Sequence, residues 1–445
     1  MMSWTRRGLI LMAGMMLAGV ISLPVLAQEA AKIDSGDTAW IITSTLLVMV
    51  MTAPGLALFY GGLVNQRNVL TTLMHSFFCL CLVSVQWVVI GYTLSFGATQ
   101  GGVIGGLGHL FFNGVGPDAN GTIPQLVFAM FQCMFAVITV GLITGAYAER
   151  ISFSAFVLFS LLWTTLIYDP LCHWVWGGGW MGPKGLKALD FAGGTVVHIS
   201  SGVSALVTIL VIGKRHGYPH SITPPHNLPF TLIGASLLWF GWFGFNAGSA
   251  LAANGLAGLA FCVTNTAAAT AALTWLLIEK IFHGKPTILG AATGAVAGLV
   301  AITPASGFVS VCSSLWIGAG AGIVCYIGVN TIKKRFGYDD TLDVFGVHGL
   351  GGTWGALATG LFASEAAGGT NGLFYGNPTQ LWLQFVSVAA TIAYAGIGTF
   401  IILKIVGMIT PLRVKVEDEV AGMDLSQHGE VAYNFFSPGM SPTSH

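Results

Sequence analysis

The chain has 445 residues, of which 54% are hydrophobic and only 8% are charged. Soluble globular proteins carry roughly 25% charged residues, so this composition excludes a soluble protein and indicates an all-α polytopic membrane protein. The formal net charge is zero, which gives no support for a nucleic-acid-binding protein.

The chain begins with a candidate signal peptide. Arg6 and Arg7 precede an apolar run, and the run ends in small residues at Ala27. A basic start, a short apolar run and a small-residue site are typical of a cleaved leader. We predict cleavage after Ala27, which makes residues 1–27 a signal peptide of a bacterial protein and leaves the mature N-terminus outside. The alternative is an uncleaved additional span.

Apolar segments follow, each near the length of about 20 residues that a helix needs to cross a bilayer. We predict eleven transmembrane helices, at residues 38–62, 70–96, 124–147, 153–177, 191–213, 230–252, 257–279, 287–303, 311–332, 344–364 and 380–407. They form a predicted membrane domain at 28–407, and residues 408–445 form a polar cytoplasmic tail.

Lysine and arginine divide unevenly between the two predicted sides. With the N-terminus outside, the inner side holds twelve: Arg67, Arg150, Lys214, Arg215, Lys280, Lys285, Lys333, Lys334, Arg335, Lys404, Arg413 and Lys415. The outer side holds three: Lys32, Lys184 and Lys187. Cytoplasmic loops carry an excess of these residues, so the pattern predicts an N-out, C-in topology.

Eleven spans fit two halves of five plus one extra span. Because five is odd, the halves would be inverted repeats, an arrangement that commonly places a substrate path at the repeat interface. The stretches DFAGGTVVH at 190–198 and DTLDVFGVH at 340–348 support such a repeat, since each carries Asp and then Val-His at the same offset.

Two histidines, His198 and His348, therefore lie inside predicted spans, each eight residues after an aspartate. Ionisable groups within spans are costly and usually face an interior path, so the mirrored pair favours a functional role. The alternative is that each neutral imidazole only hydrogen-bonds a neighbouring helix. A metal site needs three or four ligands, and no Cys, Asp or Glu is placed to complete one, so neither a metal nor a cofactor is expected.

The two aspartates have a simpler interpretation. Asp190 is expected to cap the start of the fifth span with its carboxylate, and Asp340 can do the same for the tenth. We favour this capping role over direct contact with a ligand.

The chain resembles the ammonium transporter family of Amt, MEP and Rh proteins across nearly its whole mature length, and within it the bacterial ammonium channels. The stretches that carry the resemblance are LFYGGLVNQRNVL (58–70), GAYAERISFSAF (145–156), HWVWGGGW (173–180), DFAGGTVVHI (190–199), PHNLPF (225–230), WFGFNAGSA (242–250), KPTILGAATGAVAGLVAITPASG (285–307) and DVFGVHG (343–349). The resemblance implies a homotrimer in the bacterial inner membrane. It also implies that each subunit conducts ammonium or methylammonium through its own pore for nitrogen uptake and is not an enzyme.

The resemblance also implies roles for single residues. Phe135, Trp176 and Ser249 match an outer site that recruits ammonium, and Phe135 with Phe245 matches a stacked pair of rings that closes the pore mouth. His198 and His348 match the twin histidines that line the pore, and Asp190 matches an acid that supports the recruitment site structurally. From the residues alone, Trp176 would be an interfacial belt residue and the phenylalanines ordinary core aromatics.

The tail segment GMDLSQHGEVAY (422–433) also matches the family. The resemblance implies regulation by a PII-type signalling protein at the cytoplasmic face, whereas a polar tail by itself is solvated or packed on inner loops. Two other functions stay open: an ammonium sensor, for which this tail is too short to hold its own output domain, and an alternating-access carrier, which the scarcity of charges within the spans disfavours.

Overall fold

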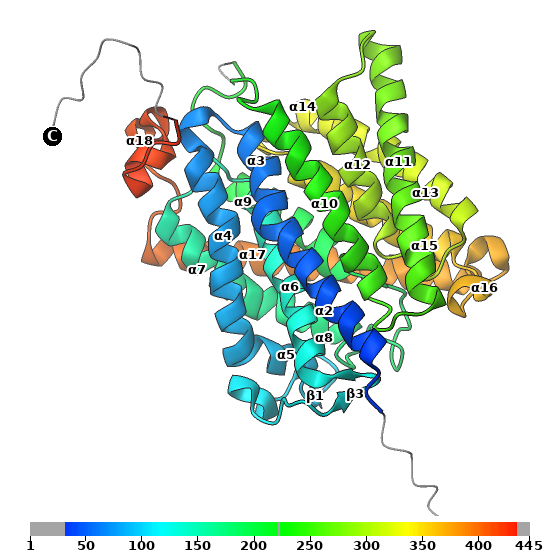
Figure 1. Ribbon diagram of the computed structural model, residues 1–445. Coiled ribbons are helices and arrows are strands. Elements are labelled where there is room, and N and C mark those ends of the chain that lie inside the picture. The colour runs from blue at the N-terminus through cyan, green and yellow to red at the C-terminus, as the bar shows by residue number, and fades with distance from the viewer. Residues whose placement is uncertain (1–31, 221–222, 434–445) are drawn as a thin grey trace, which may run out of the picture.

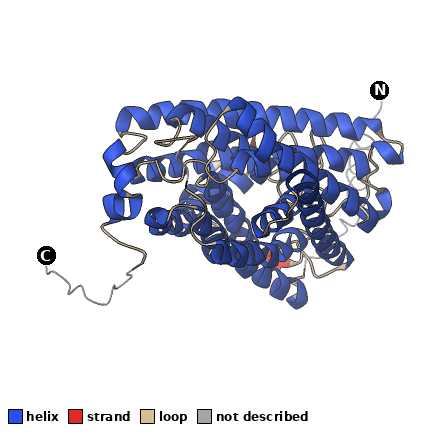
Figure 2. Cartoon of the chain, turned by 90° about the horizontal axis from the view of Figure 1, so that it is seen from above, coloured by secondary structure: helices blue, strands red, loops and turns tan. Residues whose placement is uncertain are grey.

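The computed structural model describes residues 32–220 and 223–433. The predicted signal peptide lies outside these residues, so its existence and cleavage stay predictions. Helices make up most of the described chain, and the few strands are short (Figure 2).

Helices occupy the positions of all eleven predicted spans. Several are composite, because they contain a π-helical turn. The label η marks these π-helical turns and also the 3₁₀ helices η2, η4 and η9. In chain order they are α2 Ser35–Val50, η1 Met51–Leu56 and α3 Ala57–Leu63; α4 Val69–Gln86, η3 Trp87–Gly91 and α5 Tyr92–Phe96; α6 Gln125–Ile143; α7 Phe153–Trp163, η5 Thr164–Tyr168 and α8 Asp169–Val175; η6 Gly194–Ile199 and α9 Ser200–Ile212; α10 Leu228–Gly248; α11 Gly255–His283; α12 Ile288–Ile302; α13 Val311–Ile327, η7 Gly328–Ile332 and α14 Lys333–Phe336; η8 Phe345–Gly349 and α15 Leu350–Phe362; and α17 Pro378–Ile409.

Within the described residues, nine helices are long and apolar enough to cross a membrane. The other two predicted spans coincide with α12 and with the η8–α15 helix. The α12 helix has 15 residues, which corresponds to about 22 Å of helix and is less than the roughly 30 Å of a bilayer core. The chain is thus a helical membrane protein with many spans, while the count of eleven stays a prediction.

Short elements fill the connections. They are η2 Gln66–Asn68, β1 Thr99–Gln100, β2 Ile104–Gly105, η4 Leu107–Phe112, β3 Ala119–Asn120, β4 Ile123–Pro124, α16 Glu365–Gly368, η9 Leu373–Tyr375, α18 Val416–Ala421 and η10 Asp424–His428. The strands pair antiparallel as β1 with β2 and β3 with β4. In Figure 1 the strands lie at the lower end of the bundle, and α14 and α18 lie at the upper end.

Glycine and alanine let the helices approach closely. A Cβ atom added to Gly298 of α12 would lie 2.4 Å from the backbone oxygen of Ala267 in α11, and one added to Gly318 of α13 would lie 2.5 Å from the same oxygen. Small residues at helix contacts are the usual way to pack helices in a bilayer, where the hydrophobic effect does not drive helices together. This packing accounts for part of the 61 glycines.

The tail packs against one end of the bundle, which we call the tail face. The carboxylate of Asp424 accepts hydrogen bonds from the backbone N–H groups of Leu70 and Thr71 at 3.0 and 2.8 Å. Glu419 accepts one from the backbone of His216 at 2.6 Å. Of the two interpretations from residues alone, packing on loops is therefore the correct one for this part of the tail.

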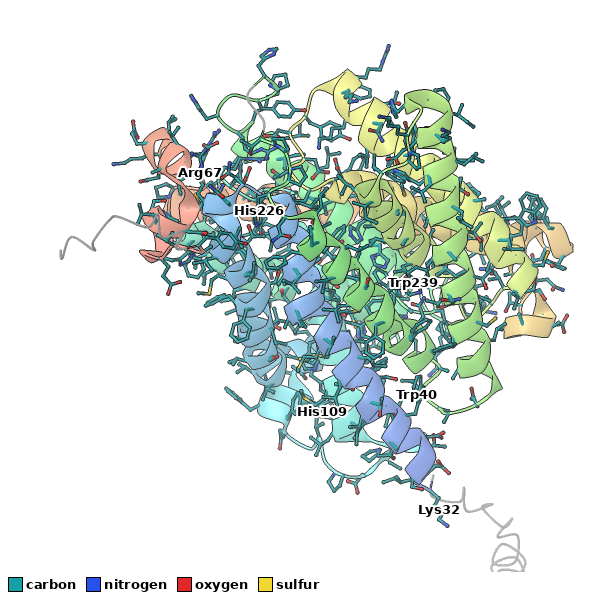
Figure 3. All side chains as sticks on the ribbon, turned by 45° about the horizontal axis from the view of Figure 1, so that its top comes forward. Lys32, Trp40, Arg67, His109, His226 and Trp239 are labelled. Atoms are coloured by element: carbon teal, nitrogen blue, oxygen red, sulfur yellow. The ribbon has the colours of Figure 1, made fainter. Side chains whose placement is uncertain are left out.

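Some of the predicted inner cations lie on the tail face, where Arg413 pairs with Glu419 of the tail at 2.6 Å. Arg67 and His226 lie at that end of the molecule, and Lys32 lies at the opposite end (Figure 3). This distribution agrees with the uneven charge pattern of the sequence. Which of the two faces is cytoplasmic stays a prediction.

Candidate functional site

The two histidines selected from the sequence meet in the interior. His198 lies on η6 and His348 on η8, and their side chains belong to residues that are 1% and 4% exposed. Their Nδ1 atoms are 3.2 Å apart, and the rings are 5.3 Å apart and nearly parallel. In a hydrogen bond between two imidazole nitrogens one must carry the proton and the other must accept it, so this geometry fits a neutral pair with opposite roles at Nδ1.

Glycines bring the two histidine-bearing helices together. A Cβ atom added to Gly202 of α9 would lie 2.1 Å from the backbone nitrogen of Gly349. One added to Gly352 of α15 would lie 2.9 Å from Cβ of His198. Any larger residue at these positions would force the helices, and with them the imidazoles, apart.

Asp190 caps the turn that carries His198, as the sequence predicted. Its carboxylate accepts hydrogen bonds from the backbone nitrogens of Gly193, Gly194 and Thr195 at 2.8, 2.6 and 2.8 Å, and also from the Thr195 hydroxyl. Its backbone oxygen accepts a hydrogen bond from Nε1 of Trp176 at 3.0 Å. Asp190 therefore connects the start of η6 to the indole of Trp176.

A row of aromatic rings leads from Trp176 to the histidines. The Phe135 ring lies 5.9 Å from the Trp176 ring in an edge-to-face contact. Phe135 and Phe245 are stacked, with ring centroids 4.1 Å apart and planes 21° apart. The Phe245 ring then lies 6.1 Å from the ring of His198. Both phenylalanines are almost completely buried, so these two rings separate Trp176 from the paired imidazoles.

Ser249 joins this arrangement through Phe245. It ends α10, and its hydroxyl donates a hydrogen bond to the backbone oxygen of Phe245 at 2.9 Å. Trp176 likewise ends α8. Both therefore lie at helix ends, as the predicted spans required.

One aromatic residue beside the histidines was missed by the sequence reasoning. The Trp242 ring lies 5.4 Å from the His198 ring and nearly parallel to it. Its Nε1 donates a hydrogen bond to Oγ1 of Thr303 at 2.9 Å, which fixes the indole in place. Trp242 opens the stretch WFGFNAGSA, so that motif is the signal that could have found it.

A cavity of about 490 Å³ lies between His348 and the tail face. Its lining combines aromatic and charged side chains, including Tyr60, Trp275, Lys333 and Asp343. The imidazole pair is therefore reached from two sides, through stacked rings on one and through this cavity on the other. Among residues 32–220 and 223–433, no three His, Cys, Asp or Glu side chains are grouped as metal ligands.

A buried charge cluster supports the loops around the cavity, and sequence reasoning did not single it out. The Arg215 guanidinium pairs with Asp339 and with Glu149, each at 2.7 Å. Arg150 is fully buried and donates to the backbone oxygen of Asp339 at 2.6 Å. Burial alone would raise the pKa of Asp339, but the hydrogen bonds and charge of Arg215 hold that pKa below its usual value.

Comparison with known proteins identifies the family. Residues 39–433 match the Ammonium Transporter Family. An ammonium transporter of Bacillus subtilis is 55% identical over 403 residues, covering 89% of this chain and 98% of the relative. The ammonium transporter Amt1 of Archaeoglobus fulgidus is 49% identical, covering 90% of this chain and all of the relative.

Solved structures agree with this match. The crystal structure of Candida albicans Mep2 has a TM-score of 0.82 and 36% identity, with 90% of this chain and 91% of the other covered. A structure named Sensor Amt Protein also has a TM-score of 0.82, at 29% identity, with 88% and 98% covered. The relatives are named as transporters, not as enzymes. The chain belongs to the ammonium transporter family.

Proposed function

We propose that this protein conducts ammonium or ammonia, and also methylammonium, across the bacterial cytoplasmic membrane through a pore lined by His198 and His348. The observation that carries the proposal is the uninterrupted row of rings from Trp176 through Phe135 and Phe245 to the paired imidazoles. Such a row of aromatic and imidazole rings suits a small polar solute that sheds its charge before it enters.

Recruitment is the first step. An ammonium ion near the faces of Trp176 and Phe135 gains cation–π attraction of roughly 0.5–2 kcal/mol. The Ser249 hydroxyl oxygen can accept an N–H hydrogen bond from the ion even while its own proton is donated to Phe245. The Trp176 indole is held by Asp190, which is the structural support we assign to that acid.

Deprotonation is the second step. An intact cation would pay a large desolvation cost between Phe135 and Phe245, because nothing in a stack of rings replaces its hydration shell. A cation that can lose a proton avoids this cost, as buried lysine shows: the pKa of its ammonium group is about 10.4 in water and falls to about 5–6 on burial. Ammonium is the same head group without the stem, so it gives its proton to water on the Trp176 side of the rings and passes the gate formed by these two rings as neutral ammonia.

Passage of ammonia along the imidazole pair is the third step. Each neutral imidazole offers one N–H donor and one acceptor nitrogen, and Nε2 of His198 has no hydrogen-bond partner among the described residues. Ammonia, which both donates and accepts, can take that place and pass along the pair into the cavity beyond His348. Potassium cannot lose a proton and forms no N–H hydrogen bonds, so the same path excludes it without a carbonyl filter.

The remaining assignments rest on the family. We propose eleven spans in two inverted halves, a cleaved leader at 1–27, a membrane domain at 28–407 with its N-terminus outside, and a cytoplasmic tail at 408–445. The 55% identity to a bacterial transporter along nearly its full length supports them. We also propose a homotrimer and a PII-type partner at the tail face, where the cavity and the packed tail offer a place for it.

A second candidate function is ammonium sensing. The likeness to a structure named Sensor Amt Protein, covering 98% of that chain, favours it. The two functions differ in whether the solute crosses, because a sensor needs only the outer site and a change that reaches the tail.

Uptake of labelled methylammonium into proteoliposomes tests the proposed function. We expect saturable uptake that unlabelled ammonium competes with and that potassium does not. Binding of methylammonium without uptake would contradict conduction and would favour the sensor. The matched control is a liposome with the same lipid and no protein, because the small neutral fraction of methylamine crosses bilayers without a protein.

A further inference from the structure

Asp340 and Asp190 occupy matching positions before the two histidine-bearing turns, yet their carboxylates have unequal surroundings. The Asp190 carboxylate accepts hydrogen bonds from three consecutive backbone N–H groups, starting at Gly193. The Asp340 carboxylate accepts one from the backbone of Phe345, 2.8 Å from Oδ2, and the backbone N–H of Val344 adds a weaker interaction. Its Oδ1 atom is buried without a hydrogen-bond partner among the described residues, and Asp340 as a whole is 1% exposed.

The nearest cation does not neutralise Asp340. Nζ of Lys333 donates to Oδ1 of Asp343 at 2.7 Å and to the backbone oxygen of Asp340, so its ion pair is with the other aspartate. The further titratable groups that interact electrostatically with the Asp340 carboxylate are Arg150 between α6 and α7, Tyr60 on α3, and Tyr338 two residues before it. The carboxylate therefore lies beside charges of both signs without a partner of its own.

A cavity open toward the tail face comes close to this carboxylate. Its neighbours Thr341 and Asp343 line the cavity of about 490 Å³ that extends to His348. Burial, together with the nearby charge of Asp343, raises the pKa of Asp340 to about 6, against the opposing effect of Lys333. The group is therefore ionised at pH 7 and takes up a proton as the pH falls through about 6.

The charge of Asp340 acts on the turn that carries His348. A carboxylate at the start of a helix is attracted by the positive end of the helix dipole and accepts backbone N–H hydrogen bonds more strongly than a neutral carboxyl group does. We infer that Asp340 is a proton-controlled positioning residue: ionised, it holds η8 and His348 in the conducting arrangement, and protonated, it weakens that hold and slows transport. This inference rests on the proposed transport function. The Asp190 carboxylate has hydrogen-bond donors on both of its oxygens, so we assign the control to Asp340 and the half that carries His348.

Methylammonium uptake by wild type and Asp340→Asn, with equal pH on both sides of the membrane, tests the inference. Asparagine is a neutral mimic of the protonated form. The ratio of wild-type to variant uptake cancels the titration of the substrate and of the shared histidines. We expect the ratio to be several-fold at high pH and to fall toward one, with a midpoint near pH 6. The conservative variant Asp340→Glu should keep a pH-dependent ratio.

Asp343→Asn gives a second, independent comparison. It removes a neighbouring negative charge and frees Lys333, and both changes favour ionised Asp340. The pH midpoint should therefore move to lower pH, so that this variant exceeds wild type around pH 6. This comparison carries the test if Asp340→Asn does not fold.

The possible results distinguish a failure of the inference from a failure of the proposed function. A wild-type to Asp340→Asn ratio that stays constant with pH would overturn the inference, and so would an Asp343→Asn profile that matches wild type or shifts to higher pH. Absence of wild-type uptake at every pH would instead overturn the proposed function, and the inference with it.

Discussion

The Nδ1 atoms of His198 and His348 lie 3.2 Å apart, although 150 residues separate them in the chain. Each histidine is carried by a π-helical turn, and a buried aspartate lies eight residues before each histidine, just ahead of the turn. An extra residue in a helical turn rotates the following side chains, and such turns occur frequently at functional sites. The contact therefore depends on local distortions in two helices at once.

Replacing Trp176 by leucine should weaken substrate binding. The change removes the indole face that attracts the cation, which corresponds to about 0.5–2 kcal/mol and hence to a rise in KM of roughly 2- to 30-fold. The measurement is the concentration dependence of methylammonium uptake. Trp382→Leu is the control, because Trp382 is 61% exposed and stacks on Phe385. Equal KM values for the two variants would contradict the role of Trp176.

Phe245→Leu should reduce the selectivity of the pore. Loss of one of two stacked rings leaves room for water beside the solute, so hydrated cations such as potassium begin to pass. A matched control lies two residues away: Phe243 stacks on Phe261 with the same 4.1 Å separation and 21° angle. Potassium current measured in both variants should appear only with Phe245→Leu. Leak through Phe243→Leu as well would indicate a general packing defect.

Asp190→Ala should destabilise the fold and lower transport together. The substitution leaves three buried backbone N–H groups at the start of η6, those of residues 193–195, without their acceptor. Loss of a helix cap typically costs about 0.5–2 kcal/mol, with more expected at a buried site. Thermal unfolding in detergent measures the loss. Asp34→Ala is the comparison, since Asp34 caps α2 at an exposed position with one backbone hydrogen bond. A larger loss with Asp34→Ala would contradict this assignment.

The Arg215–Asp339 pair should make stability depend on pH on the acid side. Despite the opposing effect of burial, Arg215 holds the pKa of Asp339 below its usual value, so the pair's contribution is present above that value and is lost as the pH falls through the lowered pKa. Removing one partner of a buried pair costs about 3–5 kcal/mol. Asp339→Asn should therefore unfold at lower temperature near pH 7, and its deficit should shrink in strong acid. A deficit that is constant with pH would contradict this account.

Sequence patterns predicted where the helices lie and which histidines meet. Apolar runs located the helices at all eleven predicted spans, because burial in lipid requires apolar residues, and the repeated Asp to His spacing selected His198 and His348. The predicted span at 287–303 matches α12 together with its two cap residues, Thr287 and Thr303.

Other features left no pattern along the chain. The buried Arg215 cluster joins three loops that are distant in sequence, so only the fold brings its charges together. Trp242 is one of 13 tryptophans, and its position beside His198 follows from the crossing of α10 and η6, not from spacing. The unequal environments of Asp190 and Asp340 are likewise invisible in two stretches that match each other residue for residue at Asp, Val and His.

The central claim is that the paired imidazoles pass neutral ammonia and exclude cations. Methylammonium flux and potassium current in proteoliposomes, for wild type beside His198→Ala and His348→Ala, test it most directly. We predict that wild type moves methylammonium and excludes potassium, and that each variant loses the flux or begins to carry potassium. Variants that transport methylammonium at the wild-type rate and still exclude potassium would contradict the claim and leave the histidines as hydrogen-bonding partners of the fold.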